Sequence, residues 1–325
     1  MRITREYCVA IRTLGTAGEK YQTLLDSLNR QTIHPKRILV YIPEGYALPK
    51  ETIGWEEYIR SPKGMITQRS LPFDEIDTEY ILFCDDDLWL ADDFVERMFA
   101  GLQDYDADCI SPDVFKVQAS SLGGVIKKAI SGYAFPRRDD GWAFKITRNG
   151  GYTYNHKPSK DVLPSESAAG ACALIKKEAY KDIHFEEERW MESFGYPLGE
   201  DLLFFYKLHS MGKRVLVHFN AGIKHLDAGA GKLVSPDAMR KGVALSLVVS
   251  HRIRYRLRHV TIMGKLLWYC SNIIRHVEQY LFIFTKGLLK ERRLIFSNYW
   301  GGVVDAYRYI HSDTYQQIPQ FDAYK

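Results

Sequence analysis

The stretch from Tyr80 to Asp87 reads Tyr-Ile-Leu-Phe-Cys-Asp-Asp-Asp, and it restricts the possible folds of this chain more than any other segment. Its apolar part has the length and continuity of a buried strand in a parallel sheet. A buried strand cannot hold three unpaired carboxylates, because removing a carboxylate from water without a partner is costly. We therefore expect Asp85, Asp86 and Asp87 at the carboxyl end of the strand, where open α/β sheets bind their ligands.

Two interpretations of these acids follow from the residues alone. Three neighbouring carboxylates repel one another, and a divalent cation such as Mg²⁺ or Mn²⁺, which prefers oxygen ligands, would relieve that repulsion. The alternative is a solvated acidic turn that caps the next helix. The first interpretation predicts a metal site, and the second predicts no site at all.

The flanking segments predict an α/β fold. Residues 7–11 and 37–42 have the pattern of short buried strands, and residues 19–30 between them have an apolar stripe at helical spacing. A strand, a helix and a strand in this order form a right-handed crossover in a parallel sheet. Further strands are predicted at 107–112, 168–175 and 215–219, and helices at 94–103 and 200–211. The expected architecture is a mostly parallel sheet flanked by helices.

Charge divides the chain into two regions. Residues 237–325 hold 14 Lys and Arg but only 6 Asp and Glu, whereas residues 1–236 hold 30 and 34. The second region also has helical apolar spacing. We therefore predict a domain over 1–236 and a helical, basic C-terminal region over 237–325, which is expected to contact something anionic.

The five cysteines are scattered without a CxxC pair, which favours a reducing compartment. The N-terminus lacks the pattern of a signal peptide, and no window has the length of a membrane span. The expected location is therefore cytoplasmic.

A second acid pair, Glu200-Asp201, stands at the start of a predicted helix. Acids there can simply favour the helix dipole. However, an aromatic loop precedes the pair, and Trp190 in that loop could contact the apolar side of a sugar ring. One of the two carboxylates could then act as a general base for an acceptor hydroxyl. His225 follows a strand and is open to either a structural role or a metal or phosphate role.

Several motifs together resemble the family 2 glycosyltransferases, which have the GT-A fold, over about residues 6 to 230. They are Leu28-Asn29-Arg30-Gln31-Thr32, the strand that ends in Asp85-Asp86-Asp87, and Gly199-Glu200-Asp201-Leu202-Leu203-Phe204-Phe205. Neither a GxGxxG nor a Walker motif occurs, which disfavours dehydrogenases and P-loop enzymes. The resemblance implies a Rossmann-like sheet of the GT-A type.

The resemblance also implies roles for individual residues. Asp85 and Asp87 match the DxD motif, with Asp85 on the ribose side of the donor, Asp87 on the metal and Asp86 in the variable middle position. On the donor side, Thr13 matches a residue that borders the base pocket, and Arg69 a basic residue near the nucleotide. Asp201 matches the catalytic base, and Glu200 beside it an acceptor-binding residue. His225 matches a late histidine near the metal and diphosphate. The family often has Asp-Asp-Gly-Ser after the second strand, but this chain has Pro43-Glu44-Gly45-Tyr46, so that Glu44 would replace the base-reading acid.

The implied function is that of an inverting, hexosyltransferase-like enzyme that depends on Mg²⁺ or Mn²⁺. It would move a sugar from a nucleotide-sugar to a glycan or lipid-linked acceptor, in the synthesis of a cell-surface polysaccharide or glycolipid. Two alternatives remain open: a nucleotidyltransferase, and a non-catalytic carbohydrate-binding protein that retains the fold.

The basic C-terminal region contains one stripe of particular interest. At helical spacing, Ile253, Leu257 and Val260 share a face, and arginines flank it. This pattern is typical of a helix in the interface of an anionic membrane, which would place the protein on the inner face of the plasma membrane. It is equally compatible with packing on the catalytic domain. No nucleic-acid-binding module is recognised, so nucleic acid is not an expected partner.

Overall fold

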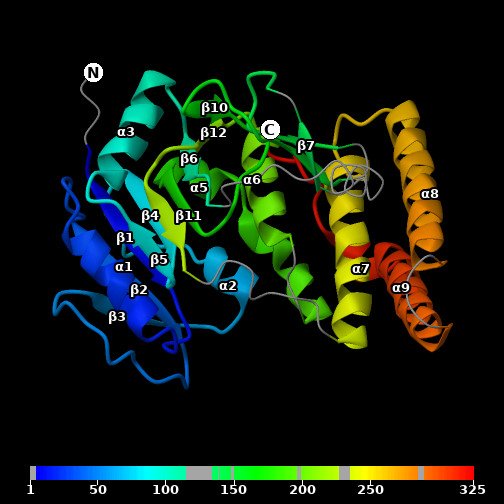
Figure 1. Cartoon of the computed structure of the whole chain (residues 1–325), viewed down its shortest axis with the longest axis horizontal. Helices are drawn as coiled ribbons and strands as arrows, with labels where there is room; N and C mark the ends of the chain where they lie inside the picture. Colours follow the sequence, from blue (N-terminus) through cyan, green and yellow to red (C-terminus); the bar gives the residue numbers. More distant parts are fainter. Residues whose placement is uncertain are drawn as a thin grey trace.

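The structure is a computed structural model that describes residues 5–114, 134–137, 139–147, 150–195, 199–226, 235–284 and 289–325. Its centre is an eight-stranded sheet (Figure 1). In spatial order the strands are β10 (Val162–Pro164), β12 (Val215–His218), β6 (Cys109–Pro112), β11 (Cys172–Lys176), β4 (Tyr80–Asp85), β1 (Tyr7–Arg12), β2 (Arg37–Pro43) and β3 (Glu57–Ser61). Strands β3, β2, β1 and β4 run parallel, as do β6 and β12, whereas β10 and β11 are antiparallel to their neighbours. The predicted α/β class with a mostly parallel sheet is confirmed.

Helices cover both faces of this sheet. Because side chains alternate along a strand, Val9 and Ile11 of β1 face one layer, whereas Cys8 and Ala10 face the other. The first layer contains α1 (Glu19–Asn29) and α3 (Phe94–Asp104). The second contains α2 (Met65–Arg69), α5 (Lys177–Asp182) and α6 (Glu200–Ser210). The two groups of helices therefore pack on opposite faces of the sheet.

Between α5 and α6, the structure differs from the expected aromatic loop. Residues Phe185–Phe194 form a 3-10 helix, η1, whose buried side chains Phe185, Trp190 and Met191 belong to the core. Two small sheets lie outside the eight-stranded sheet. One pairs β5 (Leu88–Leu90) with β13 (Ile223–His225), and the other joins β7 (Ala134–Arg137), β9 (Tyr152–Asn155) and β8 (Phe144–Ile146).

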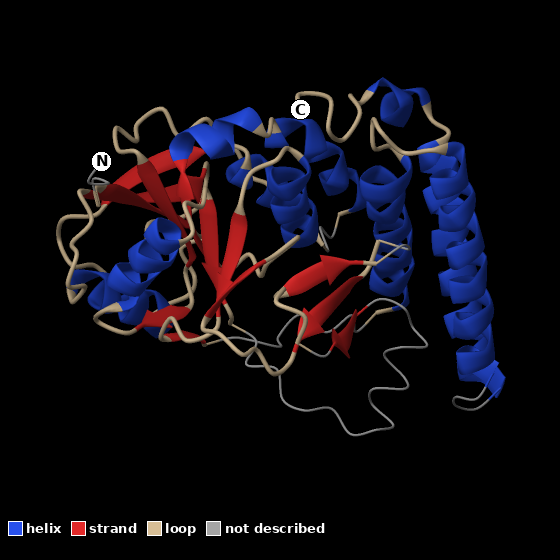
Figure 2. Ribbon diagram, turned by 90° about the horizontal axis from the view of Figure 1, so that it is seen from above, coloured by secondary structure: helices blue, strands red, loops and turns tan. Residues whose placement is uncertain are grey.

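The C-terminal region is helical, as predicted. Its elements are α7 (Pro236–Ser250), the π-helical turn η2 (His251–Tyr255), α8 (Ile262–Phe284), α9 (Leu289–Ile310) and α10 (Asp313–Gln317). Helices α7, α8 and α9 lie together at the end of the molecule remote from β1–β3 (Figures 1 and 2). Helices α7 and α9 approach closely because Gly302 has no side chain: a Cβ there would lie 2.5 Å from the carbonyl oxygen of Arg240. Within the described residues, none of the helices is long and apolar enough to span a bilayer.

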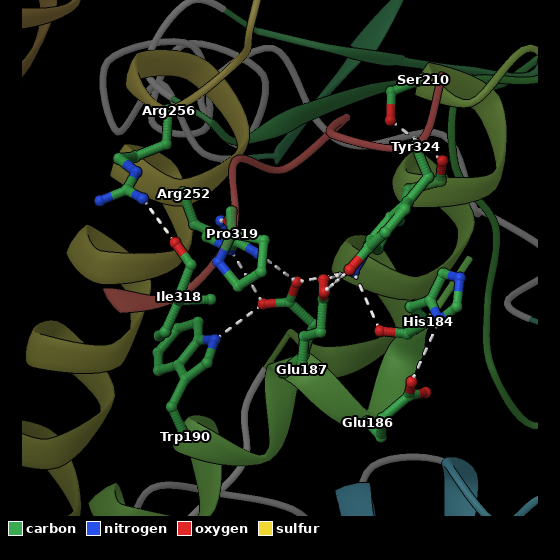
Figure 3. Close-up of polar contacts among 12 residues, drawn as sticks. His184, Glu186, Glu187, Trp190, Ser210, Arg252, Arg256, Ile318, Pro319 and Tyr324 are labelled. Atoms are coloured by element: carbon green, nitrogen blue, oxygen red, sulfur yellow. Dashed lines mark hydrogen bonds and ion pairs between the residues drawn. The ribbon is translucent and has the colours of Figure 1, made fainter. Parts of the chain in front are cut away.

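The membrane interpretation of the stripe around Ile253 is wrong. Ile253 and Leu257 are buried in the same hydrophobic cluster as Met191 and Phe204. Arg252 is fully buried and donates two hydrogen bonds to Glu188 of η1, over 3.0 and 2.7 Å (Figure 3). The alternative, in which this stripe packs on the catalytic region, is the one that the structure contains.

Candidate active site

A cleft of about 630 Å³ opens where β1 and β4 end. Seven of the residues predicted from the sequence line it together: Thr13, Arg69, Asp85, Asp86, Asp87, Glu200 and His225. The cleft is also lined by Arg12, Leu14, Thr16, Ala17, Lys20, Lys63, Gly64, Met65 and Gln68. Residues separated by more than 200 positions in the sequence therefore share one cavity.

The acidic wall is built by the parallel pairing of β1 and β4, which places Arg12 opposite Asp85. Nη2 of Arg12 donates to Oδ1 of Asp85 over 2.8 Å, and the Thr13 hydroxyl donates to Asp86. Burial raises the pKa of Asp85, although the positive charges of Arg12 and Arg69 oppose this effect. Thr13 and Asp85 thus belong to one polar network at the mouth of the two strands.

Asp87 and His225 are brought together by the small sheet. Strand β13 pairs with β5 so that His225 lies opposite Leu88, and the amide of Leu226 donates to the carbonyl oxygen of Asp87 over 2.8 Å. As a result, Nε2 of His225 lies 3.0 Å from Oδ1 of Asp87. Both side chains are largely shielded from solvent, with exposed fractions of 24% and 16%.

The donor chemistry of this pair suits a divalent cation. A carboxylate and an imidazole are both accepted ligands of Mn²⁺, and Mg²⁺ is usually bound by one or two carboxylates together with substrate phosphates. Among the described residues, no group of three or more His, Cys, Asp and Glu side chains is placed to hold a metal ion.

Glu200, which lines the cleft, and Asp201 beside it stand at the start of α6. Gly199 precedes them with a φ of 85°, a left-handed conformation that favours glycine. Nη2 of Arg69 lies 3.1 Å from Oε1 of Glu200 and 3.0 Å from Oδ1 of Asp201. Gly170 allows this approach, because a Cβ there would lie only 1.7 Å from Oδ1 of Asp201.

The carboxyls of Glu200 and Asp201 differ in environment. Burial, together with the charge of Asp201, raises the pKa of Glu200 to about 8. Glu200 therefore holds a proton at neutral pH. The Asp201 side chain is 36% exposed, against 12% for Glu200.

Two buried N–H groups in the cleft, Nε of Arg12 and Nε of Arg69, have no hydrogen-bond partner. Buried polar atoms in folded proteins are almost always paired, and exceptions often mark a functional site. Two unpaired N–H donors suit a ligand that has anionic oxygens.

One comparison with known protein families matches part of the chain. Residues 57–183 match the model of the family described as Glycosyl transferase family 2. The matched segment includes Arg69 and the acids Asp85 to Asp87, and it ends before Glu200.

No curated protein matches the sequence. Among solved structures, one match is entitled "Crystal structure of GalNAc-T7 with UDP, GalNAc and Mn2+", with 13% identity and a TM-score of 0.48. The match covers 84% of this chain and 55% of that chain, so the chain spans little more than half the length of that protein.

Element η1 fixes the helix that carries Arg69. The Glu192 carboxylate of η1 accepts hydrogen bonds from the amide and the hydroxyl of Thr67 in α2, over 2.8 and 3.0 Å. Gly64 leaves room for it, because a Cβ there would lie 2.3 Å from Oε1 of Glu192. The position of Arg69 therefore depends on η1.

Three predicted site residues are not among those that line the cleft. Asp201 adjoins the lining residue Glu200 but does not itself line the cleft, so its role as catalytic base stays a prediction. Glu44 is exposed after β2 and is not among the residues that line the cleft, so its donor-binding role stays a prediction. Trp190 is buried, and its ring packs near Phe194, Tyr309 and Tyr315 while its Nε1 donates to Glu188 over 2.7 Å. This placement does not support acceptor binding by Trp190, because no open ring face is left for a sugar.

Sequence reasoning missed Arg12 and Lys63. Arg12 was expected in a loop, but it is the last residue of β1. A positive charge directly after five buried residues, in a strand parallel to the one that ends in Asp85, is the signal that could have identified it.

Proposed function

We propose that this protein is an inverting glycosyltransferase that moves a sugar from a nucleotide-sugar donor to a hydroxyl group of an acceptor. The observation that carries the proposal is a single cleft that Asp87, His225 and Glu200 line together. Asp201 lies beside Glu200, and Nη2 of Arg69 is within 3.1 Å of both carboxylates. The family match supports the class of reaction.

The donor binds with its diphosphate at the acidic wall. Mg²⁺ or Mn²⁺, held by Asp87 and His225 and by phosphate oxygens, would neutralise charge that develops on the diphosphate as the glycosidic bond breaks. The unpaired Nε–H groups of Arg12 and Arg69 supply further donors for anionic oxygens. Asp85, with Thr13 and Asp86 in the same network, contacts the nucleoside side of the donor.

Asp201 acts as the general base. It accepts the proton of the acceptor hydroxyl as that oxygen bonds to the anomeric carbon, and the nucleoside diphosphate leaves from the opposite face with the bonding electron pair. One displacement of this kind inverts the anomeric centre. Glu200, protonated at neutral pH, donates a hydrogen bond to the acceptor and holds no competing charge beside the base.

The acceptor belongs to the same proposal. A glycan or lipid-linked acceptor, used for cell-surface polysaccharide at the inner face of the plasma membrane, agrees with the basic balance of residues 237–325, which hold 14 basic and 6 acidic side chains. A nucleotidyltransferase and a non-catalytic carbohydrate-binding protein remain the rival functions, and both are distinguished by the experiment below.

The test is calorimetric titration with a panel of nucleotide-sugars, with and without Mn²⁺, followed by a transfer assay with the donor that binds. We compare the parent chain with Asp87→Ala and Asp201→Asn. Asp87→Ala should abolish the Mn²⁺ dependence of donor binding. Asp201→Asn should keep donor binding and lose at least about 10²-fold in kcat, the usual contribution of a general base.

The matched control is Asp92→Asn, which removes an exposed carboxylate that lies 3.3 Å from Arg30 and outside the cleft. It should leave binding and transfer unchanged. Product anomers are assigned by NMR, and retention of configuration would refute the single displacement. Binding of glycans without any nucleotide-sugar would favour the carbohydrate-binding protein, and release of diphosphate from a nucleoside triphosphate would favour the nucleotidyltransferase.

A further inference from the structure

Helix α8 turns its apolar side away from the protein. Between Ile262 and Leu281, each exposed residue is apolar, a tyrosine or a cysteine. These residues are Ile262, Met263, Leu266, Leu267, Tyr269, Cys270, Ile273, Ile274, Val277, Tyr280 and Leu281. Ile262 is 88% exposed, Ile273 60% and Leu281 61%, so the face is open along the helix.

The polar side of α8 is directed inward. Asn272 is buried, Nη2 of Arg275 donates to the hydroxyl of Ser246 in α7 over 3.0 Å, and His276 lies 2.8 Å from the hydroxyl of Tyr299 in α9. A helix on the surface of a soluble domain has the reverse arrangement, with polar residues in water. This orientation leaves a large apolar surface in water, which is typical of an interaction site.

The sequence around the face is basic. Residues 258–293 carry seven Lys and Arg but two Asp and Glu. Arg258 and His259, just before α8, are exposed. Positive charge around an apolar helix face is complementary to a surface that is anionic outside and apolar below.

We propose that α8 docks on the surface of a lipid bilayer that contains anionic lipids. The helix lies in the interface, with the residues from Ile262 to Leu281 named above among the acyl chains and the basic residues near the headgroups. Tyr269 and Tyr280 suit this depth, because a phenol has an apolar ring and a polar end.

A second copy of the chain fits this face less well. Protein interfaces usually contain about one hydrogen bond per 100–200 Å² and a polar rim, and the exposed face of α8 has no polar side chains besides two tyrosines and a cysteine. A symmetric pair would also bring two basic segments together. A bilayer requires no hydrogen bonds from this face and attracts the same charges.

The experiment is vesicle flotation of the full chain, which needs no sugar transfer and can fail or succeed independently of the proposed function. Vesicles of phosphatidylcholine alone are compared with vesicles that also contain phosphatidylglycerol. The variant Ile273→Glu/Val277→Glu places two charges in the centre of the face. The matched control, Leu48→Glu/Trp55→Glu, introduces the same charges at two exposed apolar residues of the sheet domain.

The parent and the control should float with the anionic vesicles, and the variant should partition at least about 100-fold less, because two large apolar side chains no longer enter the bilayer. Cys270 provides a second measurement on the parent sequence, since it is the exposed one among the five cysteines. An environment-sensitive fluorophore on Cys270 should shift to the blue when anionic vesicles are added.

Three results would overturn the proposal. They are a parent chain that does not float with the anionic vesicles, a variant that floats like the control, and a Cys270 fluorophore whose emission does not shift when anionic vesicles are added. A dimer that light scattering detects in the parent and not in the variant would assign the face to a second copy instead.

Discussion

The buried ion pair between Arg252 and Glu188 gives the sharpest quantitative prediction about the stability of this chain. Arg252, Glu188 and Lys207 are all fully buried. The Glu188 carboxylate accepts hydrogen bonds from Arg252 over 3.0 and 2.7 Å, from Lys207 over 3.1 Å and from Nε1 of Trp190 over 2.7 Å. The network joins η2, η1 and α6, so it connects the C-terminal region to the helix that carries Asp201.

The magnitude follows from the charge of Glu188. Although burial opposes it, the two cations lower the pKa of Glu188 from 4.5 to about 2, which corresponds to about 3 kcal/mol of stability at neutral pH. Breaking a buried pair by removal of one partner typically costs about 3–5 kcal/mol. Arg252→Met keeps the length of the side chain and removes its charge, so we expect a loss of about 3 kcal/mol in the free energy of unfolding.

The assay is urea unfolding followed by tryptophan fluorescence, at pH 7 and pH 4. Because the folded pKa of Glu188 is depressed, the stability it provides is present above its unfolded value of 4.5 and is lost as the pH falls toward about 2. The parent should lose part of this stability between pH 7 and pH 4. In Arg252→Met the buried Glu188 carboxylate has lost one of its two cationic partners. Its protonation between pH 7 and pH 4 should therefore not lower the free energy of unfolding as it does in the parent.

The matched control is Arg240→Met, which breaks a more exposed pair with Asp305 in the same C-terminal region. Such surface pairs contribute about 0–1 kcal/mol. Arg252→Lys retains the positive charge but loses the bidentate hydrogen bond to Glu188. Its free energy of unfolding should be intermediate between those of the parent and Arg252→Met. Equal losses in Arg252→Met and Arg240→Met would refute the reasoning.

Two further predictions concern the cleft. Burial raises the pKa of Glu200 from 4.5 to about 8, so this group lowers the free energy of unfolding as the pH rises through that interval. In urea unfolding, Glu200→Gln should remove this dependence of stability on pH. The variant should keep most of the parent's kcat at pH 7. An unchanged pH dependence would contradict the assignment of the proton to Glu200. Gly170→Ala should displace the Asp201 carboxylate, because the new Cβ would lie 1.7 Å from its oxygen, and so reduce kcat at least about tenfold while calorimetric donor binding is kept. Donor binding lost in parallel with kcat would show that the substitution disturbs more than the base.

The sequence predicted those parts of the site that depend on local pattern. An apolar run that ends in Asp85 to Asp87 places the acids at the end of a strand for reasons of solvation alone. The same holds for Glu200 and Asp201, because a helix start favours acids whether or not they are catalytic. These elements need no knowledge of distant contacts.

Other features of the site depend on pairings that local pattern does not encode. The contact of His225 with Asp87 results from a three-residue pairing between β13 and β5. The burial of Trp190 results from Tyr309 and Tyr315, more than 100 positions later. Arg12 is stabilised at the end of a buried strand because Asp85 of the neighbouring strand compensates its charge.

Two segments of the C-terminal region show why an apolar stripe beside basic residues does not by itself identify a membrane helix. The stripe around Ile253 could reach a bilayer only if the pair of Arg252 with buried Glu188 were broken, at about 3–5 kcal/mol, and if buried Ile253 and Leu257 left the core. Helix α8 can bind a bilayer without breaking a buried ion pair or moving residues out of the core. Its exposed residues can enter the interface while Asn272 and Arg275 keep their hydrogen bonds. The direction of the polar side, which only the folded chain defines, therefore decides between the two segments and favours α8.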